Sequence, residues 1–291
     1  MKKFLAVALA AVMLFAFAAC GGKTNTDANT NTDAPAAAKV KLVDIQLSSE
    51  EYAFGVDKDQ PELLADVNAF IEKILKDGTF EAICNKYLGN GTPEGVASAE
   101  YDASKDNQLI VATNAEFAPF EYKDGDLYYG IDMEIAALLA KELGKELVID
   151  NMDFEAVCLS VEERCDIAMA GLSVNAEREK SVTFSTPYYK SAQKIIVKGD
   201  DARFDACKTA EDVEAVLAAL DEGTKIGAQT GTTGALYIKG DEAFGFPGIA
   251  NAEAVTYDSA ALATQDLLNG RVDFVIVDAD PAVAIVTAVN G

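Results

Sequence analysis

Short apolar segments alternate with amphipathic segments along most of the chain. Strand-like runs at residues 109–113, 146–150, 225–228 and 253–257 are each followed by a stretch whose apolar residues recur at helical spacing. Repeated strand–helix alternation is typical of an open α/β sheet. The alternation is interrupted at residues 194–197, where we expect the chain to cross a hinge, and it then starts again. The pattern predicts two α/β lobes with a cleft between them.

The elements at the two ends of the sequence are in an unusual order. Two strands, two helices and a loop-like segment come first, at residues 41–45, 52–56, 62–76, 80–87 and 89–108. Two strands and two helices do not form a stable domain by themselves. At the other end, a strand at 274–277 and a helix at 281–288 lack the following strand that would complete their crossover. Each end of the sequence therefore carries an incomplete unit.

Composition excludes several classes of function. The net charge of -24 argues against nucleic acid and anionic membrane surfaces as direct partners. The sequence contains no histidine, which removes Ser-His-Asp triads and histidine-ligated metals. Its five cysteines show no CxxC spacing, so zinc and redox motifs have no support. We therefore expect no metal and no cofactor.

The first residues indicate export. Two lysines precede an apolar run at residues 4–19, which is shorter than the ~18–20 residues that span a membrane. The run ends at Cys20 in a sequence that resembles a bacterial lipobox, with Phe17 where leucine is usual. We expect a lipoprotein signal peptide at 1–19, lipidation of Cys20 and a disordered tether at 20–39, since 21–38 are rich in small and polar residues. The alternative is an ordinary signal peptide with an incidental cysteine.

The strongest chemical signal lies in residues 167–189. A short apolar strand at 167–170 is followed by Gly171, Ser173 and, five residues later, Arg178. An arginine folded back over the end of a strand can bind a carboxylate by two parallel hydrogen bonds. A carboxylate clamp beside free carbonyl groups suits a free amino acid. On this segment alone, the alternative that Arg178 belongs to a solvated charged helix is the stronger one.

The same segment carries a resemblance to a known family. Its sequence, AMAGLSVNAEREKSVTFSTPYY, resembles the signature of the polar amino-acid family (family 3) of bacterial extracellular solute-binding proteins, the receptors of ABC importers. Further matching stretches are TNAEFAPFEY, GIDMEIAALLAKELG, DFE at 153–155 and VDFVIVDADPAVA. The resemblance covers nearly all of the chain after the tether. It implies the two-lobe type II periplasmic-binding-protein fold, an α/β fold with a hinge and an inter-lobe cleft.

The resemblance also explains the order of the elements. In the family, the last strand, a hinge strand and a terminal helix pair follow the helix that here ends near residue 288, and similar sequences stand here at residues 40–88. We therefore expect a circular permutation. Lobe 1 then comprises residues 57–195, including the permuted helices at 61–88 and a linker at 89–108, and lobe 2 comprises 40–56 plus 196–291. The rival explanation is that 40–88 completes a neighbouring molecule by swapping.

The resemblance assigns roles to residues at the strand ends of both lobes. It implies that Phe117 and Phe154 flank the ligand side chain, that Arg178 binds its carboxylate and that Asp278 binds its ammonium group. A turn that opens a helix after Gln229 would close over the carboxylate. The full set of expected ligand-binding residues is Asn114, Phe117, Phe154, Ala170, Gly171, Ser173, Arg178, Gln229, Thr232, Thr233 and Asp278. Taken alone, the two phenylalanines would serve equally well in a core, and Asp278 would more often be a turn or cap residue.

The resemblance implies a receptor without catalytic activity. It would bind a free L-amino acid by hinge closure and deliver it to the membrane permease of an ABC importer, from the outer face of the plasma membrane, as a monomer. Relatives that favour lysine or arginine tend to carry an acidic residue at the position of Asn114, and Gln229 stands at an often basic position, so we expect a neutral polar ligand. The alternative is a dehydratase of aromatic amino-acid synthesis on the same fold, with Glu116 as the acid.

Overall fold

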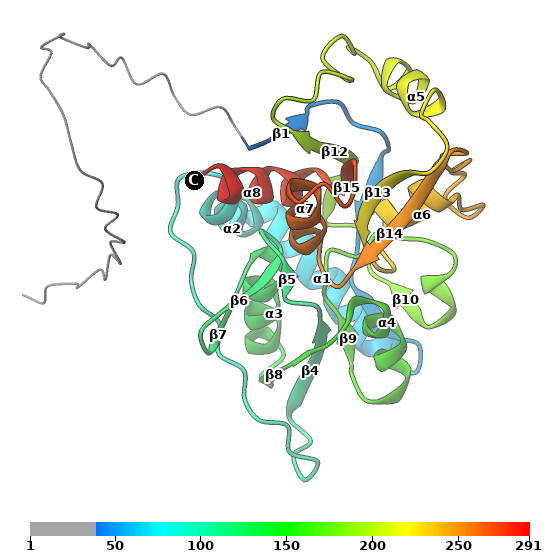
Figure 1. Cartoon of the computed structure of the whole chain (residues 1–291). Helices are drawn as coiled ribbons and strands as arrows, with labels where there is room; N and C mark the ends of the chain where they lie inside the picture. The colour runs from blue at the N-terminus through cyan, green and yellow to red at the C-terminus, as the bar shows by residue number, and fades with distance from the viewer. Residues whose placement is uncertain (1–38) are drawn as a thin grey trace, which may run out of the picture. The chain divides into compact units, whose positions relative to one another are not determined.

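The computed structural model describes residues 39–291. The expected signal peptide at 1–19, the lipidation site Cys20 and nearly all of the tether lie outside these residues. Within them, no helix is both long and apolar enough to span a bilayer. The described residues form two five-stranded sheets and two small ones, with eight helices (Figure 1). The mixed α/β architecture expected from the strand–helix alternation is confirmed.

One large sheet, which we call the lobe 2 sheet, combines both ends of the described chain. Its order is β1-β12-β15-β13-β14, from Val40–Val43, Gln193–Lys198, Phe274–Asp278, Thr224–Gln229 and Ala252–Tyr257. Strands β13, β14 and β15 are parallel, whereas β12 runs antiparallel to β15 and to β1. The helices that accompany this sheet are α5 (Ala210–Ala218), α6 (Thr233–Lys239), α7 (Ala260–Leu268) and α8 (Ala279–Asn290).

The other large sheet, which we call the lobe 1 sheet, has the order β10-β3-β9-β4-β8. Its strands are Val182–Phe184, Gly55–Asp57, Ile167–Ala168, Gln108–Thr113 and Glu146–Asn151. Strand β3 lies between β10 and β9 and runs antiparallel to both. The accompanying helices are α1 (Pro61–Asp77), α2 (Thr79–Leu88), α3 (Ile131–Glu142) and α4 (Phe154–Glu163). The early segment of the chain therefore supplies an interior strand of this sheet.

The chain crosses between the two large sheets at a pair of antiparallel strands. Strand β2 (Glu50–Tyr52) pairs with β11 (Tyr189–Ser191) in a separate two-stranded sheet. The strand expected at 52–56 is thus two strands, and Gly55 and Val56 belong to the lobe 1 sheet instead of lobe 2. Gly55 permits this because a Cβ atom there would lie 2.9 Å from Val182 Cγ2 on the neighbouring strand. Likewise β12 begins at Gln193, so the second crossing precedes the expected boundary at 195.

The three-stranded sheet was not expected from the sequence. Strands β5 (Glu116–Phe117), β6 (Glu121–Asp124) and β7 (Leu127–Tyr129) form an antiparallel meander before α3. The short charged helix expected around Arg178 is a single 3₁₀ turn, η1 (Arg178–Lys180).

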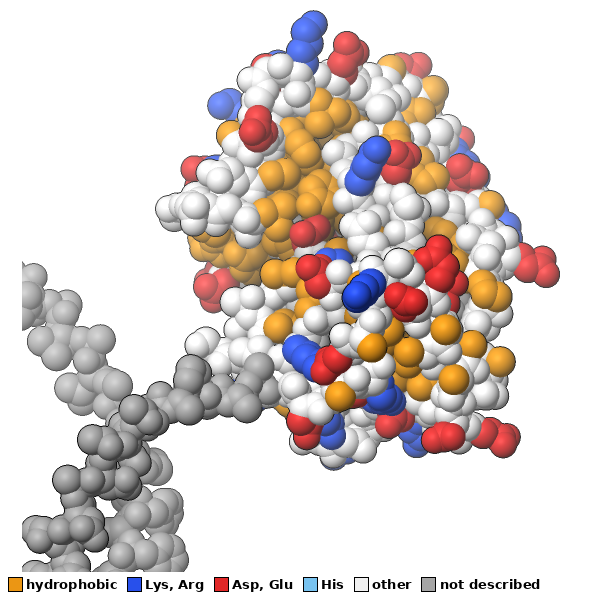
Figure 2. Space-filling model, turned by 90° about the horizontal axis from the view of Figure 1, so that it is seen from above, with side chains coloured by type: hydrophobic (Ala, Val, Ile, Leu, Met, Phe, Trp, Pro, Cys, Tyr) orange, Lys and Arg blue, Asp and Glu red, His pale blue; other side chains and the backbone are white. Residues whose placement is uncertain are grey.

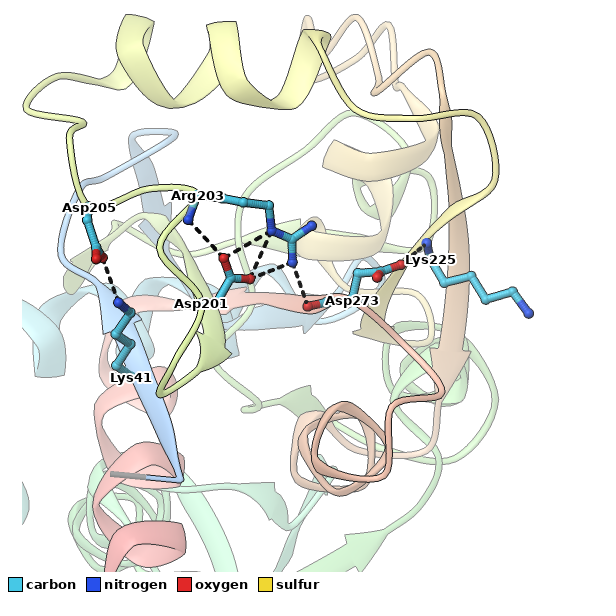
Figure 3. A network of polar contacts seen from close by, with 6 residues as sticks. All are labelled: Lys41, Asp201, Arg203, Asp205, Lys225 and Asp273. Carbon is cyan, nitrogen blue, oxygen red and sulfur yellow. Dashed lines mark hydrogen bonds and ion pairs between the residues drawn. The ribbon is translucent and has the colours of Figure 1, made fainter. Parts of the chain in front are cut away.

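The two ends of the described chain meet in lobe 2. The Asn290 side chain, at the end of α8, accepts hydrogen bonds from the backbone N–H groups of Lys39 (2.9 Å) and Val40 (3.3 Å) and donates to the carbonyl of Val40 (2.9 Å). Lys41 on β1 forms an ion pair of 2.6 Å with Asp205, at the exposed edge drawn in Figure 3. Exposed ion pairs contribute little to stability, so the backbone pairing of β1 with β12 is the main attachment of this segment.

The same edge carries a second group of polar contacts. Arg203 binds the Asp201 carboxylate and the carbonyl of Asp273, whose own carboxylate accepts from the Lys225 N–H at 2.8 Å (Figure 3). Charges of both signs are scattered over the face in Figure 2, with apolar side chains exposed among them. No continuous basic surface for an anionic partner is visible on that face, in keeping with the strongly negative net charge.

Candidate functional site

The expected site residues stand where strands of the two large sheets end. Asn114 follows β4, Gln229 is the last residue of β13, and Asp278 is the last residue of β15. Open α/β sheets present ligand-binding groups outside the carboxyl ends of their strands. The side chains of all three residues are buried. The first comes from lobe 1 and the other two from lobe 2.

Arg178 is directed toward lobe 2. Its Nη1 donates to the carbonyl of Ser173 (2.7 Å), and its Nη2 donates across to the carbonyl of Gly231 (3.3 Å). Its guanidinium also lies over the ring of Phe154, 5.1 Å from the centroid, in a cation–π arrangement. Arg178 is therefore not one charge of a solvated helix, which answers the alternative that the isolated segment favoured.

Two further hydrogen bonds join the lobes around Arg178. Gln229 donates to the side-chain oxygen of Asn114 (2.8 Å), while Asn114 donates to the carbonyl of Met152 (2.8 Å). Thr233 donates to the Ser173 hydroxyl at 3.3 Å. The hydroxyl of Thr232 instead turns back to the carbonyl of Gln229 (2.7 Å) and caps its own turn. The structure thus brings most of the expected residues into one inter-lobe cluster, with the Thr232 hydroxyl engaged locally.

Gly171 is placed where only glycine fits. Its φ of 52° lies in the left-handed region, and a Cβ atom would come within 2.9 Å of Phe117 Cε1. Phe117 packs beneath it and is buried, as is Ala170. The backbone N–H of Gly171 donates to Asp132 (3.0 Å). The strand end is therefore held closely against the aromatic floor of lobe 1.

A buried glutamate, which the sequence reasoning missed, lies in the same cluster. Glu50 on β2 is 5% exposed and accepts a hydrogen bond from the Ser173 hydroxyl (2.7 Å). Asp278 is 4% exposed and accepts from the Tyr52 hydroxyl (2.6 Å). Burial and the neighbouring Glu50 carboxylate raise the pKa of Asp278 to about 7, whereas Arg178 acts to lower it. Arg178 and Asp278 are thus close enough to interact electrostatically.

Two more carboxyl groups are buried beneath the site in lobe 1. Asp132 accepts from the Tyr188 hydroxyl (2.7 Å), and burial raises its pKa to about 7. Glu121 is fully buried, neither of its carboxylate oxygens has a hydrogen-bond partner, and burial raises its pKa well above the ordinary range. Glu116, expected as the acid of an enzyme, is exposed.

Burial of Asp132 makes stability depend on pH. A carboxyl group whose pKa is higher in the folded than in the unfolded state binds more protons when folded, so stability falls as pH rises from about 4 to 7. We expect Asp132→Asn to reduce the loss of melting temperature between pH 5 and pH 8 by several degrees. Exposed Asp126→Asn is the matched control and should leave that loss unchanged. An equal pH dependence in Asp132→Asn and the parent would contradict the assignment.

The described residues hold no group of three or more Asp, Glu, Cys or His placed to bind a metal. Cys158 and Cys165 are free thiols, as are Cys84 and Cys207. No disulfide therefore joins Cys158 to Cys165 in this part of the chain.

Comparisons with known proteins bear on this geometry. Residues 109–239 match the model of the bacterial extracellular solute-binding proteins, family 3. ABC transporter arginine-binding protein 1 of Escherichia coli is 30% identical over 185 residues, which is 63% of this chain and 68% of that protein. The arginine-bound form of truncated ArgBP from T. maritima shares 31% identity with a TM-score of 0.51, covering 62% of this chain and 78% of that one. The chain belongs to family 3 of the bacterial extracellular solute-binding proteins.

Membership confirms the resemblance and the expected type of fold. The cyclohexadienyl dehydratase of Pseudomonas aeruginosa is also similar, with 28% identity over 59% of each chain. The match spans 37% of the length of the arginine-binding extracellular protein ArtP of Bacillus subtilis and 68% of the Escherichia coli protein. An extracytoplasmic location is in keeping with the family's description.

Proposed function

We propose that the protein is the receptor of an ABC importer and captures a free amino acid between its lobes. One observation carries the proposal: the guanidinium of Arg178 reaches from lobe 1 to the carbonyl of Gly231 in lobe 2, and its charge acts on the buried carboxyl group of Asp278 in the same lobe. A free amino acid carries a negative carboxylate and a positive ammonium group on the same α-carbon. Opposite charges fixed on two lobes match that pattern, and they hold the ligand only when the lobes are together.

Hydrogen-bonding capacity supports these roles. A guanidinium has five N–H donors, so the bonds from Arg178 to two carbonyls leave donors for a ligand carboxylate. The Ser173 residue belongs to the same group of contacts, because its carbonyl accepts from Arg178 and its hydroxyl donates to Glu50. Contacts that exist only in the closed form shift the population toward closure. A micromolar ligand would supply about 8 kcal/mol, which exceeds a closure cost of a few kcal/mol.

The side-chain end of the site favours a neutral polar ligand. The amides of Asn114 and Gln229 face each other across the cleft, and the oxygen Oε1 of Gln229 is buried without a hydrogen-bond partner. An acceptor in that position suits a ligand side chain that donates a hydrogen bond, such as an amide. Relatives named for arginine and for cystine keep those two ligands in the test set.

The remaining parts of the proposal concern location and chain order. Lipidation of Cys20 would hold the receptor on the outer face of the plasma membrane beside the permease, and we expect a monomer. We also propose that the chain is circularly permuted relative to its family, with lobe 1 at 57–195 and lobe 2 at 40–56 plus 196–291. The strand bounds move the two crossings by about two residues, because β3 of the lobe 1 sheet begins at Gly55 and β12 of the lobe 2 sheet begins at Gln193. The contacts of Asn290 with Lys39 and Val40 support this order, because a short connection there would restore the usual sequence of elements.

A thermal-shift screen against the twenty amino acids and cystine tests the function. We expect a neutral polar amino acid, with L-glutamine as the first candidate, to raise the melting temperature in a concentration-dependent way, because a ligand that binds only the folded state stabilises it. D-Glutamine is the matched control. Absence of any shift with all twenty-one compounds would refute the proposal.

The dehydratase alternative rests on the buried Glu50 and on the similarity to cyclohexadienyl dehydratase. An enzyme of that class needs a placed acid in its cleft. Incubation with a cyclohexadienyl substrate decides between the two: we expect the substrate to be recovered unchanged, and its conversion would favour the alternative.

A further inference from the structure

Glu50 is held rigidly at the hinge. It is the first residue of β2 and the Cα partner of Ser191 on β11. Its Oε1 accepts from the Ser48 hydroxyl (2.6 Å) and from Nε2 of Gln193 (3.1 Å), and its Oε2 accepts from the Ser173 hydroxyl (2.7 Å). All three donors are uncharged. The carboxyl group of Glu50 is therefore fixed in position by donors that bring no positive charge to it.

Glu50 and Asp278 form a pair of buried carboxyl groups with no cation of the protein bound to either. Gln193 stands opposite Asp278 on the neighbouring strand and donates to Glu50, which places the two carboxyl groups close together, and the Glu50 carboxylate acts to raise the pKa of Asp278. Among residues 39–291, no lysine or arginine forms an ion pair with either group. Arg178, whose charge acts on Asp278, donates its hydrogen bonds to two backbone carbonyls instead. Two buried like charges without a cation are costly.

A third acceptor lies beside this pair. Gln193 is fully buried, stands opposite Asp278 in the β12–β15 ladder, and donates from Nε2 to Glu50. Its oxygen Oε1 has no hydrogen-bond partner. Buried polar atoms without partners are rare because burial takes away their hydrogen bonds to water and nothing replaces them. Three acceptor groups thus gather at one point between β2, β12 and β15.

A primary ammonium group matches this arrangement. It carries three N–H donors and a positive charge, and the cluster offers two carboxylates and one amide oxygen. We propose that Glu50 and Asp278, assisted by Gln193, together bind the ligand's α-ammonium group, so that Glu50 is a ligand-binding residue common to all amino acids that the site accepts. This inference rests on the proposed amino-acid binding. Because Glu50 lies on the crossing strand β2 and accepts a hydrogen bond from Ser173 of lobe 1, binding of the ammonium group would also be coupled to closure of the hinge.

The test compares Glu50→Gln with the parent by isothermal titration. The probes are L-glutamine, L-arginine, L-histidine and L-cystine, which share the α-ammonium group and differ in side chain. We expect Glu50→Gln to weaken each probe that the parent binds by about tenfold or more and by a similar factor, since each loses one charged partner. The matched control is Glu51→Gln, which removes the exposed neighbouring carboxylate and should bind like the parent.

A second measurement separates ligand contact from a structural role. Glutamine keeps the shape of glutamate and removes a buried charge, so the melting temperature of Glu50→Gln without amino acid should equal or exceed that of the parent. Unchanged affinity, a loss confined to one probe, or a loss accompanied by a lower melting temperature would each overturn the inference while leaving the proposed function intact. A parent protein that binds none of the amino acids would overturn the proposed function and, with it, this inference.

Discussion

Replacing Arg178 with alanine is expected to abolish amino-acid binding at micromolar concentrations. The proposed pair consists of Arg178 and the carboxylate of the bound amino acid. Removal of one partner of such a buried, hydrogen-bonded pair costs about 2–5 kcal/mol, which corresponds to a loss of affinity of about 30-fold or more. Among the hydrogen bonds of the described residues, Arg178 is also the only side chain of lobe 1 that donates to the carbonyl of Gly231 in lobe 2. Titration calorimetry with the amino acid that gives the largest shift in the screen measures the effect.

Two further variants control this experiment. Arg178→Lys keeps the charge but loses the planar two-point geometry, so we expect an affinity between those of the parent and the alanine variant. Lys180→Ala removes an exposed positive charge two residues away and should bind normally. Full binding by Arg178→Ala would refute the assignment of the carboxylate site.

A chain that begins at Gly89 is expected not to fold cooperatively. It lacks β3, an interior strand of the lobe 1 sheet, and it lacks the buried face of α1, formed by Leu63, Val67, Phe70, Ile71 and Ile74. Burial of each large apolar side chain contributes about 1.5–3 kcal/mol, so their sum is comparable with the ~5–15 kcal/mol that stabilises a whole domain. Circular dichroism during heating would show a broad transition without a sharp midpoint.

The matched control has the same residues in another order. Moving residues 39–88 to follow Gly291 through a short flexible linker preserves every strand pairing, and we expect its melting temperature to stay within several degrees of the parent. A truncated chain that unfolds as sharply as the parent would show that the early segment is dispensable, and would contradict both the packing and the proposed permutation.

The sequence was most informative where an element has one clear periodicity. The helices expected at 62–76 and 80–87 are α1 and α2, each with one added residue at each end. The meander of β5, β6 and β7 was missed because its strands are only two to four residues long and include exposed charges. So short a strand carries no readable alternation, and its existence depends on the turns that bring its partners together.

The residues of the site likewise fall into those that the sequence indicates and those that it does not. Arg178, Asp278 and the Gly171–Ser173 strand end belong to motifs that the sequence displays, and the structure gathers them in one cluster. Glu50, Gln193 and Glu121 carry no such signal. Glu50 stands beside another glutamate, Glu51, and only the pairing of β2 with β11 decides which of the two faces inward. Burial of this kind is produced by contacts between residues more than a hundred positions apart, which local patterns do not record.

The order of strands in the two large sheets bears on how the polypeptide acquires its structure during synthesis. Every strand of the lobe 1 sheet lies between residues 55 and 184, so the ribosome delivers that half as one continuous stretch. The other half needs β1 from the beginning and β15 from the end. Lobe 1 can therefore assemble while translation continues, whereas β1 stays unpaired until β12 has been made, and their sheet is extended only after β15 follows.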